Sequence, residues 1–576
     1  MDLGRKSRRL SRGVRALLAL ALIELLWLLP SQALPGAAGA AALGGTWGWR
    51  GLFARAWISA DLLALATWVV LRPTRRVARI AAGLTAFLLL WETYEVVVLR
   101  LFHRAPVIYN DLLLAEDALN LALDLGPGVW VASLAGVVLW AAAALLLLPR
   151  LYTWIGAAAE PLTPRGKAAG AVLVAIFLLG VHLEHGLHRR DSLAQSTALR
   201  LVANLWESVE MARALETPVT APGTPTNAQA FSHAVLPETP DIYLVVLESY
   251  GMVLAEDPGL APRWHAYLEA WERRLRAAGF LLSSGQSVSP CVGGESWLAS
   301  TSILEGIRTT SQHRYRQVVA TRPYGMPRFF AERGYATVGI QPANRARPGI
   351  PLVDPYGWQH PVFFEQLAYH GPSFGWGVVP DEYSLRYAYD QVIRPLPAPR
   401  FVYFATVSTH APWTAIPQIT GDWRVLPPAP EVGARADAPF LDRLLYKLRR
   451  RLRRPGDFRF DAEAYFAAIR YDLEVLFRFL LERAGEDVVL LIVGDHQPPF
   501  LPVTPSHATP VHVLSRRPAF QAAWEQEGFV PGVAAERAVP TAHWALYSLL
   551  VRALLAGTDP GALPPRLDGG AALVAR

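Results

Sequence analysis

The stretch DVVLLIVGDH, residues 487–496, decides the fold of the C-terminal part of this chain. An unbroken run of valine, leucine and isoleucine ends abruptly in an acid and an imidazole, Asp495 and His496. Such a run is typical of a strand that is buried on both faces of a sheet. Three other stretches have the same form and end in or near a polar group: DIYLVVLES (241–249, Glu248), YATVGIQPAN (335–344, Asn344) and FVYFATVSTH (401–410, His410).

Longer amphipathic helical segments separate these short apolar runs from about Pro240 to Gly557. This alternation predicts an α/β domain with a largely parallel central sheet. In open sheets of this kind, ligands bind at the carboxyl ends of the strands. Strands that end in polar groups therefore predict one shared site.

The groups that end these strands suit a metal ion. Glu248, Asp495 and His496 offer oxygen and nitrogen donors for one divalent cation, zinc, manganese or magnesium. Each residue also has a simpler interpretation, because acids at strand ends cap helices and single histidines are common on surfaces. We expect a metal site because all three residues stand at the ends of apolar runs that are predicted to be strands of one sheet.

Cys291, which lies in a predicted turn, is the candidate nucleophile. It belongs to SVSPCVGGESWLASTSILEG (287–306), where two glycines precede an expected helix, and Cys291 is the only cysteine of the chain. A metal lowers the pKa of an adjacent thiol, so we expect Cys291 to be both a ligand and the attacking group. The alternatives are an inert, packed cysteine, replacement by one of three nearby hydroxyls, or a catalytically silent domain; the hydroxyls belong to Ser296, Thr301 and Ser302.

The first third of the chain has the composition of a membrane protein. Hydrophobic residues make up 52% of the chain, and they concentrate here. We predict an α-helical transmembrane bundle of about five spans: Val14–Pro30, Leu52–Leu71, Val77–Leu99, Gly128–Leu148 and Ala168–Val181. Arginines precede the first span and follow the second and fourth, which predicts an inner (cell) membrane protein whose C-terminal domain lies on the outer, periplasmic side. A cleaved signal peptide in place of the first span leaves that orientation unchanged.

These features predict that the chain has four parts. They are a transmembrane domain (1–184), an amphipathic helix with a Pro- and Thr-rich linker (185–239), the extracytoplasmic domain (240–557) and a C-terminal tail (558–576). The net charge of +7 comes without the basic and aromatic stripe of a nucleic-acid-binding domain, so we exclude nucleic acid as a partner. The basic run LLYKLRRRLRRPG, which contains Lys447 and Arg454, is either a solvated helix face or a patch for anionic lipid.

Four motifs together resemble one enzyme family. VVLES, PCVGGESWLAST, VSTHAPW and IVGDHQPP are similar to the motifs of the sulfatase and alkaline phosphatase superfamily. Five spans before an outward domain resemble its membrane-anchored, lipoteichoic acid synthase-like branch of phosphoglycerol and phosphoethanolamine transferases. The resemblance covers about Pro240 to Ala556 and implies a sulfatase-like α/β fold.

The resemblance also implies roles for residues. The metal ligands of the family correspond to Glu248, Cys291, Asp495 and His496, and the histidine that contacts the substrate phosphate corresponds to His410. One departure is that relatives of this branch have threonine where Cys291 stands. True sulfatases convert a cysteine to formylglycine within Cys-x-Pro-x-Arg, and this chain lacks that proline and arginine.

The function predicted from these observations is transfer of a phosphoglycerol or phosphoethanolamine group through a covalent enzyme intermediate. The donor would be the headgroup of a membrane phospholipid, and the acceptor an envelope glycan or lipid. His410, Asn344 and Trp413 are the predicted substrate-binding residues, and His507 and His512 follow the Asp-His pair closely. The alternatives are a periplasmic sulfatase or phosphatase that acts on soluble esters, and a non-catalytic lipid-binding membrane protein.

Overall fold

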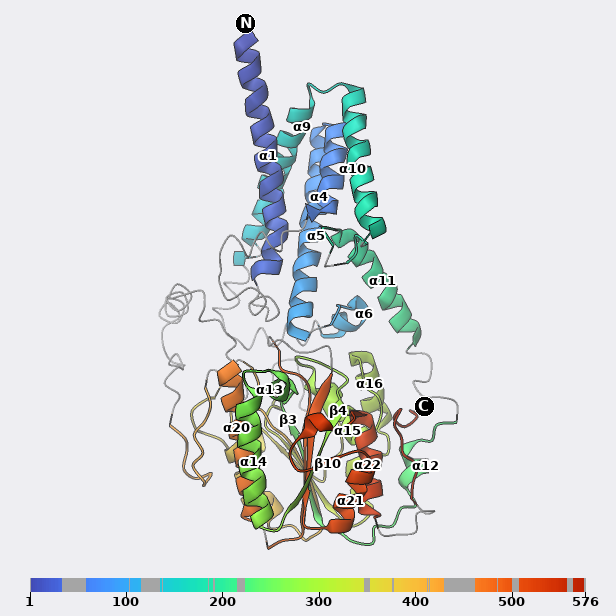
Figure 1. The fold of residues 1–576 in the computed structure, drawn as a ribbon, viewed down its shortest axis with the longest axis vertical. Coiled ribbons are helices and arrows are strands. Elements are labelled where there is room, and N and C mark those ends of the chain that lie inside the picture. Colours follow the sequence, from blue (N-terminus) through green and yellow to red (C-terminus); the bar gives the residue numbers. More distant parts are fainter. Residues whose placement is uncertain are drawn as a thin grey trace. The chain divides into compact units, whose positions relative to one another are not determined.

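The chain folds into two compact units, which are described separately here. The first comprises residues 1–100 and 104–212, and the second residues 101–103 and 213–576. The structure is a computed structural model (Figure 1). It describes residues 2–33, 58–102, 104–114, 135–136, 138–184, 186–189, 192–214, 223–346, 353–374, 378–411, 413, 415–428, 462–483, 485–499, 507–556 and 563–573. The basic run around Lys447 lies outside these residues.

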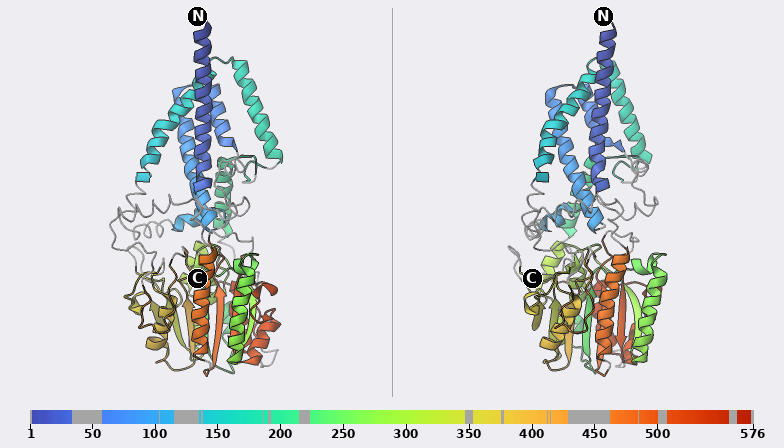
Figure 2. Two further views of the ribbon diagram at one scale, coloured as in Figure 1. Left: turned by 60° about the vertical axis from the view of Figure 1, so that its left-hand side comes forward. Right: turned by 90° about the vertical axis from the view of Figure 1, so that its left-hand side faces the viewer.

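Helices that run side by side form the first unit (Figures 1 and 2). The long elements are α1 (Asp2–Ala33), α4 (Ala60–Leu71), α5 (Arg75–Phe102), α9 (Leu148–Ala159), which continues a π-helical turn η2 (Ala143–Leu147), and α10 (Pro164–Glu184). Shorter elements are β1 (Ile58–Ser59), α6 (Ile108–Asp111), η1 (Leu112–Leu114) and β2 (Ala194–Gln195), and α11 (Thr197–Ala214) ends the unit. Small residues line the contacts between α1, α4, α5 and α9, among them Ala19, Ala66, Ala81 and Gly156. Such residues allow close approach of helices in a membrane.

The prediction of five membrane spans is corrected to three. In the part of the chain that the structure describes, the helices long and apolar enough to cross a bilayer are Arg75–Leu99, Val138–Ala159 and Pro164–Glu184. The third and fifth predicted spans are confirmed as such helices, and the fourth overlaps Val138–Ala159 over residues 138–148, while most of its earlier residues lie outside the described part of the chain. Of the second predicted span, residues 58–71 are described; they contain the 12-residue helix α4, which at 1.5 Å per residue reaches about 18 Å of the roughly 30 Å required. The first lies within α1, which is not among the three.

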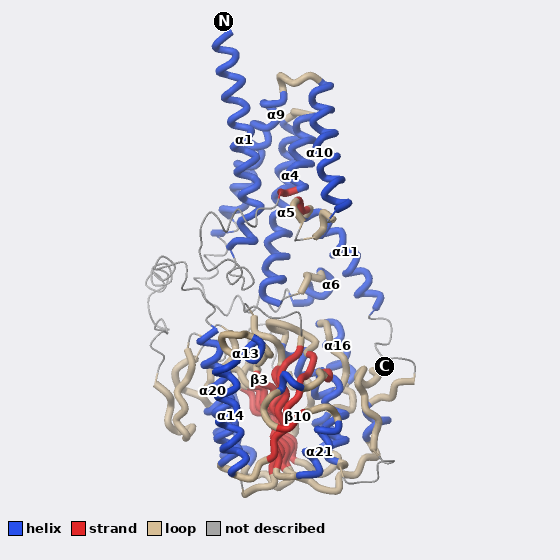
Figure 3. The backbone as a smooth tube through the Cα atoms, viewed as in Figure 1, coloured by secondary structure: helices blue, strands red, loops and turns tan. Residues whose placement is uncertain are grey.

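A nine-stranded sheet forms the centre of the second unit (Figure 3). The strands are β3 (Asp241–Leu247), β4 (Leu281–Val288), β5 (Ala336–Gln341), β6 (His360–Phe363), β7 (Arg400–Ala405), β8 (Val488–Gly494), β9 (Ala508–Ser515), β10 (Val530–Pro531) and β11 (Thr541–Ala542). Their order is β10-β4-β9-β8-β3-β7-β5-β6, and β11 pairs with β4.

The sheet is mixed, which corrects the prediction of a largely parallel sheet. Strands β8, β3, β7, β5 and β6 are parallel neighbours, as the apolar runs predict. Strand β9 is antiparallel to both β8 and β4, and β10 is antiparallel to β4. Strand β9 follows β8 through a connection that contains no helix among the described residues, and such a short return favours the antiparallel direction.

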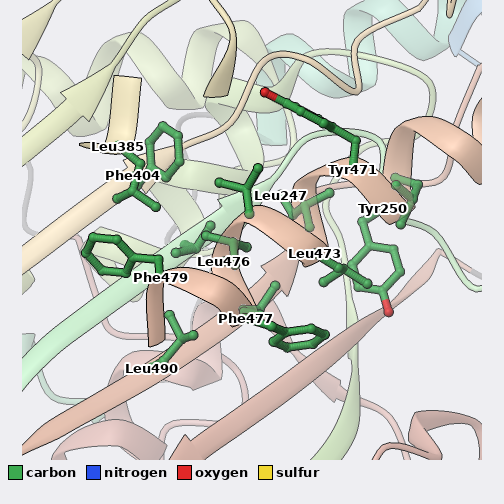
Figure 4. Close-up of a cluster of buried hydrophobic side chains, with 14 of the residues drawn as sticks. Leu247, Tyr250, Leu385, Phe404, Tyr471, Leu473, Leu476, Phe477, Phe479 and Leu490 are labelled. Atoms are coloured by element: carbon green, nitrogen blue, oxygen red, sulfur yellow. The ribbon is translucent and has the colours of Figure 1, made fainter. Parts of the chain in front are cut away.

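Helices cover both faces of the sheet (Figure 3). One face packs against α14 (Ala261–Ala277), α18 (Asp381–Ala388) and α20 (Ala462–Leu481), and the other against α15 (Ser296–Glu305), α17 (Met326–Ala331), α21 (Pro518–Gln526) and α22 (Leu546–Leu554). Alternate residues of β3 enter the two cores: Tyr243 and Val245 on one side, Ile242 and Leu244 on the other. Helix α20 packs its leucine and phenylalanine side chains against β3, β7 and β8 (Figure 4).

Short elements complete the second unit. They are α12 (Asn227–Phe231), α13 (Val253–Glu256), α16 (Gln312–Thr321), η3 (Glu365–Leu367), η4 (Tyr389–Ile393), η5 (Ala535–Arg537) and η6 (His543–Ala545). Parts of the predicted linker and tail join this core: Phe231 is fully buried, and Leu567 and Ala571 pack beside it in the same cluster. The structure thus packs residues on both sides of the predicted boundaries against the sheet.

Candidate metal and catalytic centre

Five strands aim their carboxyl ends at one edge of the sheet. Strands β8, β3, β7 and β5 are parallel neighbours, so the residues that follow them meet there. Strand β4 is antiparallel to β9, and β9 is antiparallel to β8. Strand β4 therefore runs in the same direction as β8. The Cys291 turn, which follows β4, therefore reaches the same edge as Glu248 and Asp495.

Three of the predicted metal ligands form a compact group. Donor atoms of Glu248, Asp495 and His496 lie within 4.8 Å of one another, and all three side chains are buried. The Nε2 atom of His496 is 3.5 Å from Glu248 Oε1 and 3.5 Å from Asp495 Oδ2. The sequence prediction that these three converge agrees with this geometry.

The hydrogen bonds of His496 prepare it to bind a cation. Its Nδ1 lies 2.9 Å from the carbonyl oxygen of Gln497, which can only accept a hydrogen bond, so Nδ1 carries the proton. The lone pair of Nε2 then faces the two carboxylates. Burial lowers the pKa of His496, which favours this neutral form. Two acids and a neutral imidazole thus face one another with lone pairs, and a divalent cation fits this donor set.

The pKa values of the two carboxyl groups shift in opposite directions. Burial raises the pKa of Asp495 well above its ordinary value, and the charge of Glu248 adds to the shift. Burial also acts to raise the pKa of Glu248, but the neighbouring His496 and His410 and hydrogen bonds lower it overall. Because metal ligands bind in their deprotonated forms, a divalent cation would favour the ionised form of Asp495.

Tight backbone contacts hold the loops after β3 and β8 together. A methyl group on Gly494 would lie 1.9 Å from the backbone oxygen of Tyr250, so only glycine fits there, and one on Gly251 would displace the side chain of Gln497, whose Oε1 would lie 2.0 Å away. Ser249 adopts φ +57°, and its amide donates to Asp495 Oδ1 at 2.7 Å. Strained backbone of this kind persists where the surrounding structure determines it and is common at functional sites.

Two hydroxyls contact the candidate metal ligands: Ser249 Oγ donates to Glu248 Oε1 at 2.8 Å, and Ser296 contacts both Glu248 and His496. Ser296 is the first residue of α15, its Oγ donates to Glu248 Oε2 at 2.8 Å, and the same atom lies 3.2 Å from His496 Nε2. The residue before it, Glu295, has φ +62°, which turns the chain sharply into the helix. The unpaired amides at the start of a ten-residue helix also favour a bound phosphate there.

Cys291 makes different contacts. Its thiol donates to Glu295 O at 3.4 Å, lies 3.7 Å from Ser289 Oγ, and packs with Leu298 and Ala299. Burial raises the pKa of the thiol well above its ordinary value, and nearby carboxylates add to this. The sulfur is not part of the compact group of metal-binding atoms among the described residues. Its roles as ligand and nucleophile stay predictions.

The other hydroxyls considered as replacements have structural partners. Thr301 and Ser302 are fully buried within α15. Thr301 Oγ1 lies 3.0 Å from Tyr356 OH, and Ser302 Oγ accepts the amide of Thr309 at 3.1 Å. Of the three hydroxyls, Ser296 alone contacts the predicted metal ligands in the described part of the chain.

The predicted substrate-binding residues have the following surroundings. His410 is partly buried in the loop after β7, and its Nδ1 lies 2.6 Å from Ala411 O. Trp413 is buried, donates to Thr409 O at 2.6 Å and packs its ring on Tyr465. Asn344 follows β5 and donates to Val353 O at 3.1 Å. Substrate contact by these three stays a prediction.

The two histidines that follow the Asp-His pair lie apart from the metal group. His507 is exposed, and its carbonyl accepts the amide of Ser289 at 2.9 Å. His512 is buried on β9 between Tyr250 OH, at 2.8 Å, and Ser284 Oγ, at 2.7 Å. It supports the loop after β3 through Tyr250.

Sequence analysis did not identify two residues, His543 and Asp381, that support the site. His543 Nε2 lies 3.2 Å from Asp495 O and its Nδ1 lies 2.8 Å from Ser287 Oγ, so it connects β4 to the metal loop. Asp381, the first residue of α18, accepts the amides of Val407 and Ser408 and so orders the segment before His410. No local pattern marks His543, because its partners are far away in the sequence.

Comparisons with known proteins identify similar solved structures. No family model matches the chain, and a search of curated proteins finds no match. Among solved structures, the lipooligosaccharide phosphoethanolamine transferase A of Neisseria meningitidis is 16% identical, with 93% of this chain and 95% of that chain covered and a TM-score of 0.47.

Two further structures share only part of this chain. The lipoteichoic acid synthase LtaP of Listeria monocytogenes is 16% identical, covering 51% of this chain and 69% of that one, with a TM-score of 0.31. The phosphoglycerol transferase GacH of Streptococcus pyogenes is 12% identical, covering 57% and 85%, with a TM-score of 0.32. By name these proteins belong to the transferase branch that the sequence motifs of this chain resemble.

Proposed function

We propose that this chain is a membrane-anchored, metal-dependent transferase. It moves a phosphoglycerol or phosphoethanolamine group from a membrane phospholipid to a hydroxyl of an envelope glycan or lipid. The observation that carries the proposal is the buried group of Glu248, Asp495 and His496 with the Ser296 hydroxyl against it. The apolar helices of the first unit support a membrane anchor, with the second unit on the outer, periplasmic side.

Glu248, Asp495 and His496 would hold the metal. A bound divalent cation lowers the pKa of an adjacent hydroxyl and stabilises negative charge on phosphate oxygens. Zinc and manganese fit a set of two carboxylates and one imidazole better than magnesium, which prefers oxygen ligands and retained water.

Ser296 is the nucleophile that we propose, in place of the predicted Cys291. The hydroxyl proton is lost to solvent, and Oγ attacks the phosphorus of the donor headgroup. The bond between phosphorus and the diacylglycerol oxygen breaks, that oxygen takes up a proton, and diacylglycerol leaves. A phosphodiester on Ser296 remains, and an acceptor hydroxyl then attacks it, loses its proton and restores the serine.

Other groups of the chain orient the substrate. The start of α15 directs unpaired amides toward the phosphate oxygens, and the His410 imidazole contacts the same oxygens. Anchoring in the membrane raises the local concentration of a lipid donor. These contributions do not depend on which headgroup is transferred.

The test uses the full chain in lipid discs that contain phospholipid labelled in the headgroup and the acyl chains. Transfer is expected to release labelled diacylglycerol and to leave the headgroup on Ser296, where peptide mass spectrometry locates it. Ser296→Ala should reduce diacylglycerol release by several orders of magnitude, as removal of a nucleophile does in other covalent enzymes. The matched variant Cys291→Ala should keep most of the activity, because the thiol packs outside the compact metal group.

Three results would change the conclusion. Loss of activity in Cys291→Ala with full activity in Ser296→Ala would return the nucleophile to the thiol. Hydrolysis of soluble phosphate or sulfate esters without diacylglycerol release would indicate a periplasmic hydrolase. A purified chain without stoichiometric metal would favour a non-catalytic protein.

A further inference from the structure

Helix α11 buries the side that a helix in water would expose. Its buried side chains are polar and recur every three or four residues: Thr197, Arg200, Asn204 and Ser208. A soluble amphipathic helix buries an apolar stripe and exposes polar residues. The orientation of α11 is the reverse.

The polar stripe of α11 is fastened to the membrane unit. Arg200 forms ion pairs with Glu92 and Glu95 of α5, and its Nε lies 3.0 Å from both Glu95 oxygens. Thr197 Oγ1 donates to Glu92 Oε2 at 2.9 Å, and the amide of Thr197 donates to Asp61 Oδ2 at 2.7 Å. These contacts fix the rotation of α11 about its axis.

Further contacts extend this attachment along α11. Asn204 donates to the carbonyl oxygen of Pro106, and the amide of Tyr109 donates to Ser208 Oγ at 3.3 Å. The attachment thus covers three turns of the helix. The acids Asp61, Glu92 and Glu95, which stand within or at the ends of predicted spans, therefore have partners on one helix.

The opposite side of α11 is exposed and is apolar from Leu199 to Val209; the exposed, charged Glu210 and Arg213 follow on this side in the last turn. Its exposed fractions are 40% for Leu199, 62% for Val202, 48% for Leu205, 64% for Trp206 and 44% for Val209. At 100° per residue these five side chains lie on one face, and the centre of the polar stripe lies about 160° away from it. Glu207 is exposed between the two faces.

We infer that α11 lies in the bilayer interface, with this apolar face against the lipid acyl chains. Three observations identify lipid as the occupant. The acids that hold α11 belong to the end of the Arg75–Leu99 span, which places the helix at the membrane boundary. Helix α10 precedes α11 in the chain (Figure 1). It also has exposed apolar side chains, including Val172, Leu173 and Ile176. Trp206 is of the residue type that concentrates at membrane interfaces.

The three sectors of α11 then have three environments. The polar stripe contacts the protein, the apolar face contacts acyl chains, and Glu207 faces water and headgroups. This arrangement does not depend on the proposed transferase reaction. It requires only that the first unit is in a membrane.

The test measures the surroundings of single nitroxide labels on the full chain in lipid discs. Cysteine replaces Val202 on the apolar face or Glu207 between the faces, in a Cys291→Ala background so that only one thiol reacts. Molecular oxygen concentrates in acyl chains, and a neutral nickel chelate stays in water. At Val202→Cys, we expect the ratio of oxygen to nickel collisions to be several-fold higher than at Glu207→Cys.

Two outcomes would overturn the inference. Equal ratios at the two positions would place the apolar face in water. Low collision rates with both reagents at Val202→Cys would show that protein covers the face, either the second unit or another copy of the chain. Leu199→Cys and Val209→Cys repeat the measurement at the two ends of the face, so that misfolding of one variant does not decide the result.

Discussion

The molecule contains two buried acidic clusters that differ in how their charge is balanced. In the membrane unit, Glu92 and Glu95 face Arg200, and the three charges are joined by direct ion pairs. In the second unit, Glu248 and Asp495 face a neutral histidine, and no arginine or lysine among the described residues forms an ion pair with either acid.

This difference separates a cluster that contains its own cation from one that does not. Burial of a carboxylate costs several kcal/mol unless a cation compensates it. Where the chain supplies the cation, as Arg200 does, the cluster holds two helices together. Around Asp495 the chain supplies only lone pairs, and a divalent cation fits this donor set.

The largest expected effect comes from removing one acid of the unbalanced cluster. Asp495→Asn should abolish stoichiometric metal binding and lower turnover by about 10² to 10³ or more, because the group that stabilises transition-state charge is lost. Elemental analysis and diacylglycerol release measure the two effects. The matched control is Glu95→Gln in the membrane cluster, which should keep its metal. Full metal content in Asp495→Asn would show that Asp495 is not needed for metal binding, and the contrast between the two acidic clusters would then fail.

A smaller effect is expected from removing the cation of the membrane cluster, where one arginine faces two carboxylates. Arg200→Met leaves Glu92 and Glu95 without the charge of Arg200, and loss of one member of a buried ion pair costs about 3–5 kcal/mol. Hydrogen exchange of the α11 amides should therefore become faster in lipid discs, while metal content stays unchanged.

A charge-matched variant sharpens this second test. Addition of Glu92→Gln and Glu95→Gln to Arg200→Met removes the uncompensated charges, and protection of the α11 amides should return in part. Protection in Arg200→Met that equals the wild-type level would show that the arginine does not balance these acids.

The smallest effect concerns a buried histidine that needs no counter-charge. Burial lowers the pKa of His512 to about 4, from an ordinary value of 6.5. Because the folded pKa is depressed, the unfolded chain takes up the proton first as the pH falls. The stabilisation is therefore complete above pH 6.5 and is lost between pH 6.5 and about 4.

The expected loss from His512 is about 3 kcal/mol, at roughly 1.4 kcal/mol per pKa unit. Thermal unfolding of the full chain at a series of pH values measures it. In His512→Gln, which cannot gain this proton, the dependence between pH 6.5 and 4 should be weaker by that amount. An identical pH dependence in both proteins would exclude His512 as the source.

Sequence reasoning located the metal group because its residues lie directly after strands. Glu248, Asp495 and His496 each follow an apolar run that could only be a buried strand. The direction of a parallel strand determines which sheet edge its last residue reaches. The distance between these residues in the sequence, nearly 250 positions, did not matter for that argument.

The choice between Cys291 and Ser296 could not be made in the same way. Ser296 is the first residue of α15 and Cys291 lies five residues before it, and which side chain faces the candidate metal ligands depends on the backbone at Glu295, where φ is +62°. A glutamate in a left-handed conformation has no local signature. The unusual thiol attracted attention, while the hydroxyl that contacts Glu248 resembled an ordinary helix-start residue.

The sequence by itself therefore determined the composition of the membrane part, the parallel strands at the centre of the sheet and the convergence of three candidate metal ligands. Their signals are local, since runs of apolar residues and the groups that end them can be recognised one segment at a time. Tertiary structure alone decided the direction of β9, the roles of His543 and Arg200, and the outward apolar face of α11. Each of these depends on a contact between segments far apart in the chain, and hydrophobic pattern does not specify which distant polar groups will meet.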